Sequence, residues 1–223
     1  MSNVVVTTTA AGTTGFDRQS PLDSSQISTM WNDTPYSVAF VDVATQSTSE
    51  DQSYVQELLD AGFYVGLFRG FYTGMFDSNP SSVGAQHAQD CINVANGFSG
   101  AAGMTLWCDL EGATSNTTAQ DIIDYANAFN SACQAAGYEG GVYVGDTEPN
   151  VQLDGSQLYY DLTTSHYWRC CSSSIWSTVD NGQVTGWQIL QTACGYDYKG
   201  VTVDNDSIQT DAAGGNAVFI KKA

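Results

Sequence analysis

The segment Met104-Thr-Leu-Trp-Cys-Asp-Leu-Glu111 decides how the fold is interpreted, because it leads an apolar run directly into two acids. An apolar run of this length is typical of a strand that is buried on both faces of a parallel sheet. Residues two apart on a strand point to the same face, with backbones roughly 6.6 Å apart. Asp109 and Glu111 are therefore expected on one face, and Leu110 on the other.

The same alternation of short apolar runs and longer amphipathic segments extends in both directions from this strand. Further strands are expected at 14–17, 36–43, 63–68, 141–145, 166–171, 186–191 and 200–203. Helices are expected at 22–32, 50–61, 81–98 and 117–136, with a short one at 157–162. The helix over 117–136 has the clearest limits, since Thr118 and Asp121 form a capping-box pattern and Gly137 follows its end.

Strands that alternate with helices predict a parallel sheet covered by helices. About eight strands in 223 residues favour a single (β/α)8-type TIM barrel, with irregular or missing late helices, over an open doubly wound sheet. No G-x-G-x-x-G sequence follows a strand, which argues against the nucleotide-binding alternative. We expect a loosely ordered lead-in over 1–12 and one barrel domain over 13–223.

The charge balance limits the possible partners. Six Lys and Arg residues face 24 Asp and Glu residues, for a formal charge of −18. Such a surface repels nucleic acid and anionic membranes, and no apolar run reaches the roughly 18–20 residues that span a bilayer. No signal peptide is recognisable, and the expected site of action outside the cytoplasm would be reached through another export route or phage delivery. The compartment and the oligomeric state are not indicated.

The cysteines and histidines do not indicate a metal site. Six cysteines and two histidines are spaced unlike any zinc pattern, and we expect no cofactor and no metal. Disulfides are possible, but their pairing cannot be derived from the spacing. Cys170 and Cys171 would point to opposite faces of a strand, so they are not expected to pair with each other.

Acids gather at the carboxyl ends of the expected strands, where parallel barrels carry their chemistry. They are Asp17, Asp42, Asp109, Glu111, Asp204 and Asp206. Two close carboxylates in a desolvated site cannot both ionise easily, so one pKa rises. We expect Glu111 to be a general acid and Asp109 to stay ionised and orient either Glu111 or the substrate. The structural alternative is an acid pair held by Arg69 or by backbone donors.

Five short motifs, in this order, give the chain a resemblance to a known group. They are Gly15-Phe-Asp17, Asp109-Leu-Glu111, Gly141-Val-Tyr143, Trp187 with Gln191, and Val203-Asp204. From about residue 14 to residue 209 the sequence resembles the lysozyme-like glycoside hydrolases of family 25. It is more similar still to the bacterial glycoside-hydrolase-like domains. Tyr143-Val-Gly145 and Tyr167-Trp168-Arg169 depart from the usual family sequences.

The resemblance implies an enzyme that cleaves β-1,4 links in peptidoglycan or a related amino-sugar polymer. Glu111 then resembles the general acid. Asp109 resembles the partner that stabilises an intermediate formed by the N-acetyl group of the substrate. Asp17 and Asp204 resemble supporting acids of the cleft. The remaining candidates for substrate binding are Tyr72, Tyr143, Trp187, Gln191, Arg69 and Asp42.

Two other hypotheses for the function of these acids remain open. In the first, the chain is a non-catalytic glycan-binding, effector or structural barrel, in which Tyr72, Tyr143 and Trp187 stack against sugars. In the second and weaker interpretation, a metal for phosphodiester cleavage is held by Asp42, Asp109, Glu111 and Asp206. The scarcity of basic residues argues against the second reading, since a phosphate substrate needs them.

Overall fold

The computed structural model describes residues 3–44, 46–146, 151–172, 186–209 and 214–223. The helices in this part are α1 (Ser24–Asp33), α2 (Thr48–Ala61), α3 (Pro80–Ala95), α4 (Ala119–Ala135) and the π-helical turn η1 (Gln157–Asp161). The strands are β1 (Val4–Thr7), β2 (Thr14–Arg18), β3 (Val38–Asp42), β4 (Tyr64–Arg69), β5 (Thr105–Asp109), β6 (Glu139–Val144), β7 (His166–Arg169), β8 (Ile189–Tyr198), β9 (Val201–Ile208) and β10 (Phe219–Lys222).

Eight of these strands close into a barrel, as the sequence predicted. Strands β2 to β8 follow one another around it and run parallel. The closing strand β9 is antiparallel to both of its neighbours, β8 and β2. The eighth strand was expected to run parallel, so its direction is a correction. Lys199 and Gly200, both at positive φ, form a two-residue turn after β8. A turn this short can only join antiparallel strands.

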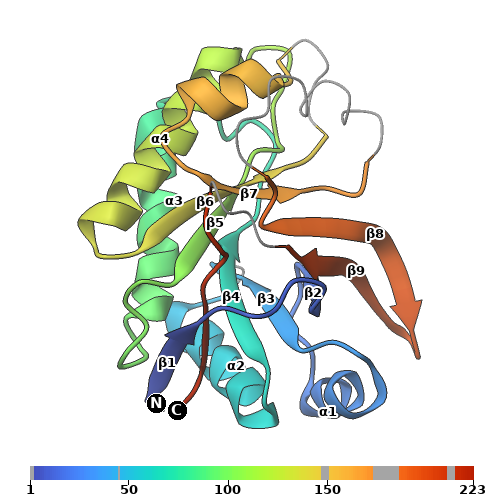
Figure 1. The fold of residues 1–223 in the computed structure, drawn as a ribbon. Helices are drawn as coiled ribbons and strands as arrows, with labels where there is room; N and C mark the ends of the chain where they lie inside the picture. Colours follow the sequence, from blue (N-terminus) through green and yellow to red (C-terminus); the bar gives the residue numbers. More distant parts are fainter. Residues whose placement is uncertain (1–2, 45, 147–150, 173–185, 210–213) are drawn as a thin grey trace.

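The helices cover only part of the barrel. Helices α1 to α4 follow β2 to β5 in turn, and the capping box of Thr118 and Asp121 begins α4 as expected. Gly62 ends α2 in the left-handed conformation at φ 113°, which a residue without a β-carbon adopts without strain. Between β6 and β7 the one helical element among the described residues is η1, and β8 joins β9 directly. In Figure 1 the β8–β9 hairpin therefore extends from the side of the barrel opposite α3 and α4.

Large apolar side chains fill the barrel below its mouth. Phe40 packs on Trp168 with ring centroids 4.4 Å apart, and Trp107 lies 6.0 Å from the same ring. Phe219 of β10 closes the lower end, 5.8 Å from Phe40. Because β10 also pairs with β1, the two ends of the chain lie side by side (Figure 1). These rings make the barrel interior below the mouth a packed core.

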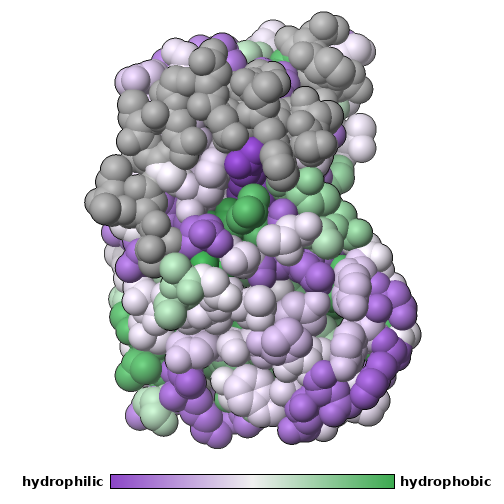
Figure 2. All heavy atoms as spheres, turned by 45° about the vertical axis from the view of Figure 1, so that its right-hand side comes forward, coloured by the Kyte–Doolittle hydropathy of each residue, from purple (hydrophilic) through white to green (hydrophobic). Residues whose placement is uncertain are grey.

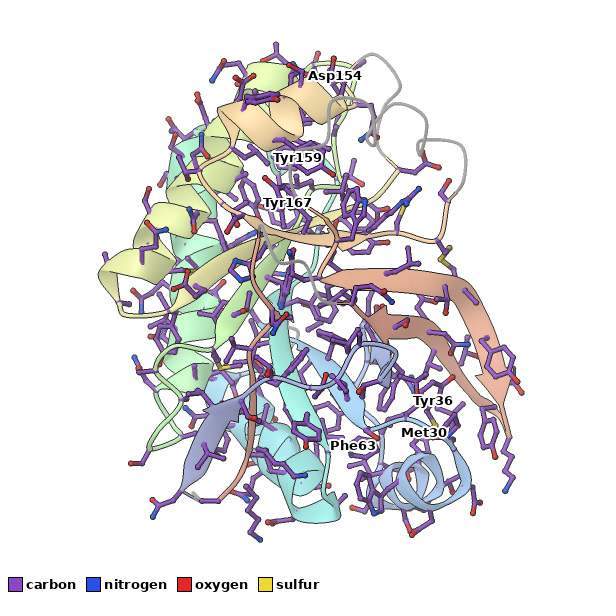
Figure 3. The ribbon with its side chains drawn as sticks, viewed as in Figure 1. Met30, Tyr36, Phe63, Asp154, Tyr159 and Tyr167 are labelled. Carbon is purple, nitrogen blue, oxygen red and sulfur yellow. A yellow bond between two sulfur atoms is a disulfide. The ribbon has the colours of Figure 1, made fainter. Side chains whose placement is uncertain are left out.

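A second apolar layer lies between the strands and the helices. Figure 3 shows Met30, Tyr36 and Phe63 gathered beside α1, and Tyr159 with Tyr167 beneath η1. The Tyr159 and Tyr167 rings are 4.8 Å apart. This layer fixes the outer faces of the strands, and the alternate residues are left for the barrel interior.

The outer surface is mainly hydrophilic on the face that includes the hairpin side, where apolar areas are small and separated (Figure 2). No helix in the described ranges is long and apolar enough to cross a membrane.

Candidate active site

A pocket of about 280 Å³ opens at the carboxyl ends of the parallel strands. Six of the residues singled out from the sequence line it together: Asp17, Asp109, Glu111, Tyr143, Gln191 and Asp204. They come from β2, β5, β6, β8 and β9, with Glu111 two residues beyond the end of β5. Closure of the barrel thereby brings together four carboxylates that are up to 187 residues apart in the chain.

Glu111 is held by the backbone around it. Its own N–H donates to Asp109 Oδ1 at 2.8 Å, so the two acids are linked through the main chain. The backbone N–H of Asp146 donates to the Glu111 carboxylate. That carboxylate lies against Gly145, which directly follows the neighbouring strand β6, and an added β-carbon there would stand 2.0 Å from Glu111 Oε1. Glycine at position 145 therefore makes the space that Glu111 occupies.

Burial disfavours the charged form of both acids. It raises the pKa of Glu111 to about 7, the charges of Asp146 and Asp204 act in the same direction, and the Asp146 N–H opposes the rise. A group with this pKa can give and take a proton at neutral pH. Burial and the Glu111 carboxylate raise the pKa of Asp109 well above its usual range. The Glu111 N–H opposes this rise, and the expectation that Asp109 stays ionised remains a prediction.

A second pair of acids, Asp17 and Asp204, forms the opposite wall. The two residues are direct partners across β2 and β9. Gln191 Nε2 donates to Asp17 Oδ2 at 2.9 Å and to Asp204 Oδ2 at 3.3 Å, while Gln191 Oε1 accepts from Tyr143 Oη at 3.0 Å. Burial and the Asp204 charge raise the pKa of Asp17 to about 7. One amide side chain thus links the two walls of the pocket.

The floor contains a residue that the sequence interpretation missed. Trp168 lines the pocket and packs edge-to-face on Tyr143 at 5.2 Å. Its indole Nε1 donates to Asp206 Oδ1 at 2.9 Å beneath the pocket. The sequence could have indicated this position, because side chains along 166–171 alternate between the two faces of the strand. His166 and Trp168 share one face, and Tyr167 faces the helices. Phe68 and Phe71 also line the pocket and were not anticipated.

Two candidates for substrate binding lie below or behind the pocket lining. Asp42 is buried and accepts the Gly70 N–H at 2.8 Å, and burial raises its pKa to about 6. Arg69 lies between strand and helix, with Nη1 4.0 Å from Asp42 Oδ1 and Nε 3.6 Å from Asp90 of α3. Arg69 therefore interacts with Asp42 in the protein interior, and the Asp109 and Glu111 pair is not among its ion-pair partners.

Two aromatic candidates also lie outside the pocket lining. Tyr72 is half exposed, and its ring contacts His87 at 5.8 Å. Trp187 is buried against Tyr167 at 5.9 Å, with the Arg169 guanidinium 5.5 Å from its ring. Of the three proposed stacking rings, the structure places only Tyr143 in the pocket.

A disulfide joins Cys171, just after β7, to Cys194 of β8, while Cys170 is buried and takes no part in this bond. The expectation that Cys170 and Cys171 do not pair is confirmed. The Cys171 N–H donates to Gln191 Oε1 at 3.3 Å, so the bridge lies next to the amide that links the pocket walls. Searched over the described residues, no group of His, Cys, Asp and Glu has a geometry that could hold a metal ion.

The closed barrel and its acidic mouth define a glycoside-hydrolase-like barrel. The chain belongs to the family described as Rv2525c-like, glycoside hydrolase-like domain, which matches residues 29–208. The match supports the glycoside-hydrolase-like resemblance and does not extend to family 25 itself. No curated protein sequence matches the chain.

Three solved structures share the fold. The Tat-secreted protein Rv2525c of Mycobacterium tuberculosis, in complex with L-tartrate, is 16% identical with a TM-score of 0.61, over 92% of this chain and 99% of that one. The catalytic domain of endolysin ply40, from bacteriophage P40 of Listeria monocytogenes, is 11% identical with a TM-score of 0.52, over 90% and 95%. The spore cortex lytic enzyme SleM of Clostridium perfringens is 13% identical with a TM-score of 0.53, over 88% and 67%.

Proposed function

We propose that this protein is a glycoside hydrolase that cleaves β-1,4 links in peptidoglycan or a related amino-sugar polymer. The observation that carries the proposal is the Glu111 carboxyl, which lines the pocket with a pKa raised to about 7 beside buried Asp109. The family description agrees with a glycosidase, and two proteins of the same fold are described as an endolysin and a spore cortex lytic enzyme.

In the proposed reaction, Glu111 donates its proton to the glycosidic oxygen as the bond to the anomeric carbon breaks. The N-acetyl oxygen of the same sugar attacks that carbon, forming a cyclic intermediate. Asp109 accepts the amide proton or stabilises the positive charge that develops on the acetamido group. Water, which gives a proton to the Glu111 carboxylate, then attacks the anomeric carbon and opens the ring, and any proton that Asp109 accepted returns to the acetamido nitrogen. The anomeric configuration is retained by this route, in which the substrate supplies the nucleophile.

Asp17 and Asp204 belong to the proposal as supporting acids that bind sugar hydroxyl groups. Tyr143 and Gln191 hold the two walls in register, since they bridge from the Glu111 side to the Asp17 side. Phe71, which is 36% exposed, offers apolar surface to a sugar ring in the same pocket, while buried Trp168 forms part of the pocket floor.

The test is digestion of peptidoglycan and of chitin-type oligosaccharides, with products identified by mass and the anomer followed by NMR. We expect new reducing ends with retained configuration. Inverted products would refute the substrate-assisted route. Binding without new reducing ends from either polymer would refute hydrolysis and favour a non-catalytic glycan-binding barrel.

A further inference from the structure

A second pocket, of about 480 Å³, lies on the outer face of the β8–β9 hairpin. A two-residue turn joins β8 to β9, in place of the helix that would cover such strands in a regular barrel. The tip of the hairpin is tied to the end of α1, because Tyr198 Oη donates to the Asp33 carbonyl oxygen and Lys199 Nζ pairs with Asp33 Oδ2 at 2.6 Å. Figure 3 shows Tyr36 between α1 and the hairpin, where this pocket lies.

Tyrosine side chains make up much of the lining of this second pocket. Tyr36 comes from the segment before β3, and Tyr196 and Tyr198 come from β8. Tyr36 is buried and its hydroxyl donates to Asn205 Oδ1, while the Tyr198 hydroxyl is held by the end of α1. Tyr196 is 47% exposed, so part of its ring is available to a ligand. Flat rings of this kind pack against the C–H faces of sugars.

The remaining lining is rich in uncharged polar groups. Hydroxyl groups come from Thr14, Thr192 and Ser207, and an amide comes from Asn205. Hydroxyl groups both donate and accept hydrogen bonds, as the hydroxyl groups of a sugar do. Because Asn205 accepts from Tyr36 through Oδ1, its Nδ2 is directed elsewhere and can donate to a ligand. The lining thus combines an accessible ring with donors and acceptors that match a sugar.

The second pocket presents little charge to a ligand. Among the described residues that line it there is no Lys, Arg or Glu. The one acid, Asp206, is 1% exposed and turns its carboxylate to the inner face of β9, where Oδ1 accepts from Trp168 Nε1 at 2.9 Å. Without a cation the pocket cannot neutralise a phosphate or a carboxylate. An uncharged ligand suits it better.

We propose that this pocket is a second carbohydrate-binding site, which holds an uncharged stretch of glycan against Tyr196. Its volume lies within the range of roughly 300–1,000 Å³ that is typical of ligand sites. A lipid or an apolar peptide fits less well, since it would cover the hydroxyl and amide groups without giving them hydrogen bonds.

The two sites lie back to back across the hairpin. Asp204 lines the candidate active site, and the next residue of β9, Asn205, lines the second pocket. Gln191 and Thr192 of β8 are divided in the same way. Successive side chains of a strand point to opposite faces, so one sheet thickness separates the two ligands. A glycan bound at the second site leaves the first site open, and the proposal goes beyond hydrolysis and does not require it.

The experiment is an NMR titration of 15N-labelled Glu111→Gln protein, which spares the ligand from turnover, with a fully N-acetylated chitin-type trisaccharide. We expect saturable shifts of the Tyr196 and Asn205 backbone signals, while the Asp109 signal reports the candidate active site separately. Adding Tyr196→Ala should weaken binding, followed at Asn205, by about tenfold. The matched control Tyr160→Ala removes a ring that is 64% exposed and outside both linings, and should leave the affinity unchanged.

A second variant guards against a folding defect in Tyr196→Ala, which the dispersion of its NMR signals reveals. Thr192→Arg places a long side chain across the pocket from an exposed position and should cause a similar loss. Saturable shifts at Asn205 with none at Asp109 support the proposal. Shifts confined to Asp109, no shifts at all, or an affinity at Asn205 that neither variant lowers would overturn it. Equal affinity at Asn205 for an anionic uronic-acid trisaccharide would overturn it as well.

Discussion

Glu111 is positioned by the absence of a side chain at Gly145, since a β-carbon there would stand 2.0 Å from Glu111 Oε1 and 2.4 Å from its Cδ. Gly145 is not among the residues with positive φ, so alanine meets no backbone strain at this position. A substitution at residue 145 therefore acts on the position of the Glu111 carboxylate.

We expect Gly145→Ala to lower kcat/KM by roughly a hundredfold, since small displacements of a catalytic group cost about this much. The Glu111→Asp variant shortens the acid and leaves space beside residue 145. In that background, adding Gly145→Ala should cost much less, and steady-state kinetics of the four proteins in a double-mutant cycle measure the difference. Equal costs in both backgrounds would mean that Gly145 does not act through Glu111.

The pH dependence of kcat/KM should show a limb near pH 7 that falls on the alkaline side. Glu111 must be protonated to act as an acid, and its pKa, raised to about 7, keeps it protonated below that pH. Asp146→Asn removes one of the charges that raise this pKa but keeps the backbone N–H that lowers it. The limb should therefore move to lower pH in the variant, as measured from pH–rate profiles. If the limb does not move, it reports the titration of a group other than Glu111.

Asp17 should lower stability as the pH rises. Its pKa is raised in the folded protein from 3.8 to about 7, mainly by burial, so its neutral form favours the fold. That stability is complete below about pH 4 and is lost as the pH rises through about 7. The rise corresponds to roughly 4 kcal/mol. Asp17→Asn should therefore raise Tm at about pH 8 and change it little at about pH 4. A stabilisation independent of pH would contradict the assignment.

The disulfide between Cys171 and Cys194 should support both the fold and the pocket. The two cysteines are 23 residues apart, and closing a loop of this length stabilises a protein by about 3 kcal/mol on the chain-entropy account. Reduction should lower Tm and raise KM, because Gln191 accepts the Cys171 N–H. The double variant Cys171→Ser, Cys194→Ser serves as the control and should show the same losses without responding to reductant. A wild-type KM that is unchanged on reduction would separate the disulfide from the pocket.

The sequence predicts most of the barrel because its local signals agree with the final fold. The capping residues Thr118 and Asp121, and Gly62 after α2, fix helix ends that the structure confirms. The closing barrel strand β9 was harder, since it was expected only at 200–203 but extends over Val201–Ile208. Asp204 and Asp206 interrupt its apolar pattern because they face the pocket region, so the residues of the candidate site concealed the strand.

The candidate site could be predicted where it depends on strand ends, and less well where it depends on packing. Asp17, Asp109 and Glu111 were predicted because a carboxylate at the end of an apolar strand is costly to bury unless another group pairs with it. Trp187 and Trp168 could not be ranked from composition, since cores and clefts both use indole rings. The structure buries Trp187 against Tyr167 and places Trp168 at the pocket. That choice depends on the register of β7 and β8, which a single sequence does not specify.

The most direct test of Glu111 as the general acid is a comparison of two identical substitutions. Glu111→Gln removes the proton donor, and Glu139→Gln makes the same change at an exposed position where β6 begins, at the other end of the barrel. Both should fold with wild-type melting behaviour or better. We predict that Glu111→Gln lowers the rate of oligosaccharide cleavage by at least about a thousandfold, while Glu139→Gln cleaves at the wild-type rate. A folded Glu111→Gln protein with wild-type activity would contradict the account.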